Sequence, residues 1–153
     1  PVAEITIPAT QGVDPSQYFQ TREGLYVWPE FSERIVSVAK KTELPEVTFR
    51  SFELVKSAND TEIRSELPED YVLEASELCG YLPEIIASQP GGEEGFLLTN
   101  GHPNVFYVRG RNGEVFAVGV LWDGVNLEWD VYADRLDDGH WSGGYRVISL
   151  ATV

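Results

Sequence analysis

Cys79 is the only cysteine in the chain, and so the only thiol that could act as a nucleophile. In papain-like and cell-wall peptidase folds, a cysteine near a helix start pairs with a histidine on a strand. Here His102 or His140 would be the base, with Asn104 or Asp130 to orient it. Cys79, however, falls on the apolar side of a predicted helix, where a thiol usually packs as a small hydrophobic group. A cysteine-dependent hydrolase using Cys79 and His102 is therefore kept as an alternative function.

A second candidate site is a set of carboxylates and aromatic rings on one predicted strand. Apolar and polar residues alternate over residues 127–134, which is typical of a strand with one face in the core and one in water. Trp129 and Val131 are expected to point inward. The charged residues that point outward could simply protect a sheet edge from aggregation. As a binding site, it predicts a contact face for a partner, made by Glu128, Asp130, Tyr132, Asp134 and Trp141.

The tryptophans are expected to lie mostly in the core. If one or two remain exposed on the sheet, they would anchor a protein partner or stack on a sugar. A sugar or small-ligand binder is therefore the other alternative function. The four residues are Trp28, Trp122, Trp129 and Trp141.

Metal and cofactor signals are absent from the sequence. His102 and His140 are 140 − 102 = 38 positions apart, which matches no zinc-binding spacing. The acidic loop around Asp137 and Asp138 lacks the alternating oxygen ligands of a calcium hand. Glycine-rich phosphate-binding motifs do not occur. We therefore expect no metal and no cofactor.

The net charge restricts the classes of partner. The chain of 153 residues has 25 acidic and 11 basic residues, a net charge of −14 and a pI near 4.4. This charge repels phosphate backbones, so we expect no direct binding to nucleic acid. A surface that solubilises the protein is the simpler interpretation, and one that docks on a basic protein is the more specific one.

Localisation is predicted from what the sequence lacks. A single cysteine allows no intrachain disulfide and favours a reducing compartment. The chain also has no apolar run of the ~18 residues that a membrane helix needs. We therefore expect a cytoplasmic protein that does not enter membranes. Because the chain begins at Pro1 and contains no methionine, its native start is expected to be missing.

Hydrophobic periodicity divides the chain into an arm and one domain. Residues 1–23 are expected to be a weakly ordered arm or linker, and 24–153 a single acidic domain. Apolar spacing and capping residues predict helices at 29–41, 60–67 and 76–89, the last kinked at Pro83. Alternation and turn residues predict strands over 24–29, 47–55, 96–99, 105–109, 115–122, 127–134 and 145–150. The predicted fold class is α+β, with helices of the first part packed on one face of a C-terminal antiparallel β-meander.

Several segments resemble a group of small uncharacterised bacterial proteins found in candidate-phylum genomes. The resemblance runs from Gly24 through Ser149. It implies one compact domain and transfers no activity, cofactor or catalytic residue. The segments that carry it are Gly24-Leu-Tyr-Val-Trp28, Asp60-Thr-Glu-Ile63, the stretch around Cys79, Phe106-Tyr-Val108, Trp129-Asp-Val131 and Trp141-Ser-Gly-Gly-Tyr-Arg-Val-Ile-Ser149.

From the sequence, we expect a non-catalytic protein-binding module, or an antagonist or immunity-type protein that covers a basic site on its target. The reasons are the acidic surface, the aromatic residues on an alternating strand and the lack of a strong catalytic motif.

Overall fold

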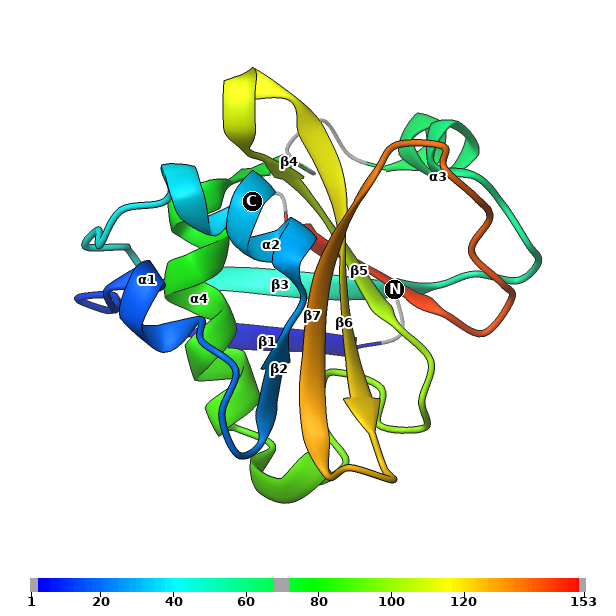
Figure 1. Cartoon of the computed structure of the whole chain (residues 1–153). Coiled ribbons are helices and arrows are strands. Elements are labelled where there is room, and N and C mark those ends of the chain that lie inside the picture. Colours follow the sequence, from blue (N-terminus) through cyan, green and yellow to red (C-terminus); the bar gives the residue numbers. More distant parts are fainter. Residues whose placement is uncertain (1–2, 68–71, 152–153) are drawn as a thin grey trace.

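A computed structural model describes residues 3–67 and 72–151, and its described part contains one eight-stranded mixed sheet (Figure 1). The α+β class is confirmed, because helices and strands are both present and the helices flank the sheet. The strands are β1 (Ala3–Ile7), β2 (Leu25–Val27), β3 (Val47–Glu53), β4 (Val72–Glu74), β5 (Asn104–Arg109), β6 (Val115–Asp123), β7 (Glu128–Arg135) and β8 (Arg146–Leu150). The helices are α1 (Pro15–Tyr18), α2 (Pro29–Arg34), α3 (Asp60–Glu66) and α4 (Ala75–Ala87), with 3₁₀ turns η1 (Val36–Val38), η3 (Pro90–Gly92) and η4 (Arg111–Gly113).

The sheet has the strand order β1-β3-β8-β5-β6-β7-β2. The expected antiparallel meander is present as β5-β6-β7, but the sheet as a whole is mixed. β2 pairs in parallel with β7, and β8 pairs in parallel with β5. β4 also pairs in parallel with β5, beyond the end of β8. Figure 1 shows β1 and β3 running across the direction of β6 and β7, so the sheet is strongly twisted.

Part of the second face of the sheet is also covered, which corrects the expectation of one buried and one fully wet face. α1, α2 and α4 lie on one side, and α3 lies on the other together with residues 136–145 (Figure 1). The first core cluster, on the α4 side, is built around Phe31, Phe49, Leu82, Phe106 and Val131. The second core cluster, on the α3 side, consists of Ala58, Ile63, Val105, Tyr107, Ala117, Trp141 and Val147.

Residues 3–23 belong to the same folded body, so the arm expected over 1–23 is wrong for this part of the chain. β1 pairs antiparallel with β3 along its whole length. Ile7 and Phe19 are each only 3% exposed and join the first core cluster. Sequence periodicity missed α1 because a single helical turn is too short to show a hydrophobic period.

Helix starts follow local chemistry, with one difference from the expectation. Asn59 caps α3, because its side chain accepts from the Glu62 N–H at 2.8 Å while Glu62 reaches back to the Asn59 N–H. α4 begins one residue before Ser76, and the capping box is formed by Glu74 and Glu77. The Ser76 hydroxyl instead accepts a hydrogen bond from the Lys40 N–H.

Two predicted elements differ from the structure of the described residues. The helix expected over 29–41 ends at Arg34 and continues as a 3₁₀ turn. The strand expected over 96–99 is a loop held by the buried side chain of Gln89. Its amide accepts from the Leu97 N–H at 2.9 Å and donates to the Leu97 carbonyl at 3.0 Å. The Gln89 side chain thus supplies the hydrogen bonds to the Leu97 backbone that a neighbouring strand would otherwise make, and the segment stays a loop.

Candidate functional site

Three strands place the predicted contact residues next to rings from a distant part of the chain. β7 lies between β6 and β2, and its alternation is confirmed, because Trp129 and Val131 are buried in the first core cluster. In the register, Asp130 is opposite Tyr26 on β2, and Glu128 is opposite Asp123 on β6. The resulting surface is called the acidic–aromatic face, and its residues are Tyr26, Trp28, Asp123, Glu128, Asp130 and Tyr132.

Trp28 is the exposed tryptophan of this face, with 42% of its surface accessible. It follows Val27, the last residue of β2, and precedes Pro29, the first residue of α2. Its ring packs edge-on against Tyr26, with centroids 5.2 Å apart. The other tryptophans are buried, as expected for most of them. Because Pro29 begins a helix immediately after it, Trp28 is held at a fixed position at the rim of the face.

Asp130 occupies the middle of the face and has an unusual electrostatic environment. Partial burial, followed by the negative charges of Glu128 and Asp123, raises the pKa of Asp130 to about 6. A hydrogen bond from the Trp28 side chain opposes this shift. The Asp130 Oδ1 atom is buried and has no hydrogen-bond partner among the described residues. The carboxylate is therefore partly removed from water without receiving a counter-charge.

Tyr132 lies flat on the sheet because its neighbour on β6 is Gly119. A Cβ atom at Gly119 would come within 2.2 Å of the Tyr132 Cζ. Burial of the phenol and the charges of Asp134 and Asp130 raise the pKa of Tyr132. The ring therefore joins the acidic–aromatic face to the second core cluster, against which it packs.

The hairpin between β6 and β7 extends the acidic–aromatic face with apolar side chains. Val125 is 91% exposed and Leu127 is 66% exposed. Leu127 has a φ of 54°, a left-handed conformation that is unfavourable for leucine. Asp123 holds the loop, since its carboxylate accepts from the Val125 N–H at 2.9 Å and from the Asn126 side chain at 2.8 Å. Protein-binding surfaces often present apolar side chains beside charged ones in this way.

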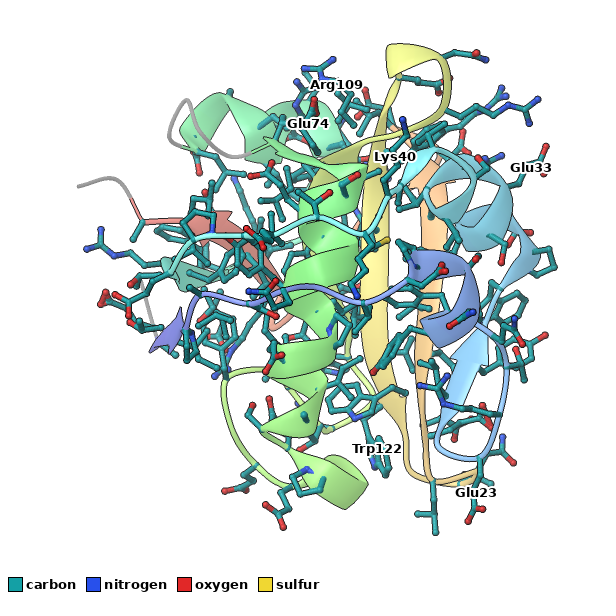
Figure 2. All side chains as sticks on the ribbon, turned by 90° about the vertical axis from the view of Figure 1, so that its left-hand side faces the viewer. Glu23, Glu33, Lys40, Glu74, Arg109 and Trp122 are labelled. Atoms are coloured by element: carbon teal, nitrogen blue, oxygen red, sulfur yellow. The ribbon has the colours of Figure 1, made fainter. Side chains whose placement is uncertain are left out.

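Cations lie elsewhere in the described part of the molecule. The four ion pairs found there join Glu4, Glu33, Glu74 and Glu114 to arginines, and none includes a carboxylate of the acidic–aromatic face. Figure 2 shows Glu74 beside Arg109 at one end of the sheet, with Glu33 at the same end. Glu23 is at the opposite end, which is also the end of the β6–β7 hairpin. The negative charge of the acidic–aromatic face is therefore not neutralised by the protein itself.

Two predicted contact residues are placed apart from this face. Asp134 is on the same side of β7, but near Arg34, whose charge partly offsets the rise in its pKa caused by burial. Trp141 is 9% exposed in the second core cluster, and its indole N–H donates to Asp60 at 2.8 Å. Tyr26 was missed, because a parallel pairing between β2 and β7 leaves no pattern in the sequence. Trp28 was named only as one of four tryptophans that could anchor a partner if exposed.

Cys79 and His102 do not form a catalytic pair in this structure. Cys79 is 0% exposed within the first core cluster, on the α4 side of the sheet. His102 packs instead against Tyr145, with ring centroids 5.1 Å apart, and Tyr145 packs on the second core cluster. The hydrolase alternative needs an accessible thiol next to a base, and this geometry provides neither.

The native protein is expected to resist thiol reagents. Burial raises the pKa of Cys79 to about 12, so the reactive thiolate is scarce at neutral pH. A chromogenic disulfide reagent at pH 8 should react with less than about a tenth of Cys79 in one hour, and fully after denaturant is added. Rapid labelling of the folded protein would contradict this placement of the thiol.

The hollows of the described structure gather few of the predicted site residues. One of about 290 Å³ is bordered by two predicted contact residues, Asp134 and Trp141, together with His140. Another, of about 520 Å³, is bordered by Phe52, Leu54, Ile63 and Leu67 between β3 and α3. A polar hollow of about 400 Å³ borders Arg146 and the 94–100 loop. Within residues 3–67 and 72–151, no three His, Cys, Asp or Glu side chains are arranged to hold a metal ion. None of the described helices is long and apolar enough to cross a membrane.

Searches against protein-family models, curated proteins and solved structures found no match to this chain. The resemblance to candidate-phylum bacterial proteins therefore stays a prediction. The chemistry and geometry of the acidic–aromatic face are the basis for the function proposed below.

Proposed function

We propose that this protein is a non-catalytic binding module that docks a basic surface of another protein on its acidic–aromatic face. The single observation that supports the proposal best is the unneutralised charge of this face. Asp123, Glu128 and Asp130 lie side by side, and the four ion pairs found among the described residues join arginines to other carboxylates. Like charges held close together repel one another and destabilise the fold. A cation from a partner would reduce this repulsion.

Neutral contacts support the same proposal. Trp28, Tyr26 and Tyr132 supply rings beside the carboxylates, and Val125 and Leu127 supply exposed aliphatic groups. Aromatic side chains are common anchors at protein interfaces, and surrounding charges give speed and selectivity to association. An antagonist or immunity-type protein that covers a basic site of its target is one version of this function.

The proposal is tested by titrating the full chain with a fluorescently labelled octalysine peptide and measuring anisotropy at 20 and 200 mM salt. The variant Glu128→Gln/Asp130→Asn should bind at least about tenfold more weakly at low salt, because two facing charges are lost. The control Glu43→Gln/Glu94→Gln removes the same net charge from exposed positions outside the face. It should stay within about twofold of the wild type, since distant charges are screened.

Equal losses in both double variants would mean that the peptide responds only to the net charge, and the proposal would fail. Binding that does not change between the two salt concentrations would also count against it, because an electrostatic interface must weaken as salt screens it.

A sugar-binding function is a second candidate. It is favoured by the exposed ring of Trp28 beside Tyr26 and by carboxylates that could accept hydrogen bonds from sugar hydroxyls. A glycan panel titrated against tryptophan fluorescence separates it from protein binding. A saturable change that is lost in Trp28→Phe would favour the sugar, and an unchanged spectrum across the panel would exclude it.

A further inference from the structure

The centre of the acidic–aromatic face has a charge that suits one cationic side chain. Asp130 is half-buried, and its Oδ1 atom is covered by protein without receiving a hydrogen bond among the described residues. A cation must therefore approach the carboxylate from the solvent side. On that side the neighbouring charges, Glu128 and Asp123, are also negative, so each of them adds to the attraction.

The rings beside Asp130 favour a planar cation. Tyr26 is directly opposite Asp130 in the parallel register of β2 and β7, and Trp28 packs edge-on against Tyr26. A guanidinium group is planar and weakly hydrated, so it can stack on a ring while it donates to a carboxylate. An ammonium group is compact and more strongly hydrated, and it gains less from a carboxylate flanked by rings.

We propose that Asp130, Tyr26 and Trp28 form a subsite for a single arginine side chain of the basic partner. This assignment rests on the proposed function and adds to it the identity of the anchoring residue. The guanidinium supplies the counter-charge that Asp130 lacks, stacks against the exposed Trp28 and the half-buried Tyr26, and leaves Glu128 to contact neighbouring basic residues of the partner.

Arginine binding to this subsite depends on pH in a defined direction. The groups that face Asp130 are Glu128 on β7, Asp123 on β6, and Tyr26 and Trp28 at β2. The pKa of Asp130 is raised to about 6, so its charge is complete only above that pH. A docked cation favours the ionised form of the Asp130 carboxylate. At pH 8 this carboxylate is already ionised, so binding exchanges no proton. Near pH 5 it is protonated, so binding of the cation releases that proton. The affinity falls as the pH drops through 6.

The test uses three tripeptides, Gly-Arg-Gly, Gly-Lys-Gly and Gly-citrulline-Gly, blocked at both ends. Citrulline has the shape of arginine without its charge. Binding is followed on the full ¹⁵N-labelled chain by the Trp28 indole N–H signal, which is assigned with Trp28→Phe. The arginine peptide should shift this signal saturably, bind at least about threefold more tightly than the lysine peptide, and weaken about tenfold from pH 7.5 to pH 5.

Asp130→Asn should weaken the arginine peptide about tenfold and remove the pH dependence, because it keeps the shape of the side chain and deletes its charge. Glu43→Gln is the matched control and should bind as the wild type does. Citrulline binding equal to arginine binding, or arginine binding unchanged in Asp130→Asn, would overturn the subsite.

The octalysine titration separates this result from the proposed function. Suppose that octalysine binds, that Glu128→Gln/Asp130→Asn weakens this binding, and that Asp130→Asn leaves the affinity for the arginine peptide unchanged. The proposed docking face is then supported and the arginine subsite is wrong. If neither the tripeptide nor octalysine binds, both proposals are wrong.

Discussion

Replacing Asp60 by alanine is expected to lower the free energy of unfolding by about 3 kcal/mol, because buried donors lose a charged acceptor. Asp60 is 2% exposed at the start of α3. Its Oδ1 accepts from the Tyr107 hydroxyl at 2.7 Å and from the Trp141 indole at 2.8 Å. Its Oδ2 accepts from the Asp137 N–H at 2.7 Å. One carboxylate thus joins α3, β5 and the 136–145 segment.

Urea denaturation followed by tryptophan fluorescence measures this loss as a lower midpoint. Asp138→Ala is the control, since Asp138 is an exposed residue of the same loop and should change the free energy of unfolding by less than about 0.5 kcal/mol. If Asp60→Ala unfolds at the same urea concentration as the wild type, the hydrogen bonds of Asp60 do not stabilise this side of the sheet.

Placing alanine at Gly119 is expected to displace the Tyr132 ring and to destabilise the protein by about 2 kcal/mol. The added methyl group would lie 2.2 Å from Cζ and 2.5 Å from the hydroxyl oxygen of Tyr132. The ring must therefore lift from β6 into solvent, since the backbone of a central strand cannot move without breaking its pairing. Burial now raises the pKa of Tyr132, so this pKa should fall towards its ordinary value.

A spectrophotometric titration of tyrosine ionisation between pH 8 and 12 measures the change directly. One additional phenol should titrate near pH 10 in Gly119→Ala, while the protein is still folded by circular dichroism. Gly139→Ala is the control, because a Cβ there meets nothing within 4 Å and the backbone is not left-handed. An unchanged tyrosine titration in Gly119→Ala would show that the ring accommodates the methyl group in place.

The sequence predicted those elements whose conformation is determined by residues close together in the chain. The alternation over 127–134 placed Trp129 and Val131 in the core, and β7 has this orientation. Asn59 predicted the start of α3, because a cap and its helix are adjacent in the chain. The left-handed Asn112 and Gly113 likewise form the expected tight turn between β5 and β6.

Long-range contacts were not predictable in the same way. Nothing near Tyr26 in the sequence indicates that it pairs with Asp130, more than a hundred positions later. The covering of the second face depends on Asp60, Tyr107 and Trp141, whose hydrogen bonds become evident only once the chain is folded. Tyr26 was therefore missed, whereas Glu128, Asp130 and Tyr132 were found from the alternation of one strand.

The position of β8 determines when the sheet can be completed during synthesis. β8 follows every other strand in the chain, yet it inserts between β3 and β5. Until residue 150 has emerged from the ribosome, the β1–β3 pair and the β5–β6–β7 meander are separate pieces, each with an open edge. A ribosome stalled before that point would carry a nascent chain with two aggregation-prone fragments, and chaperones that cover open strand edges would be needed at this stage.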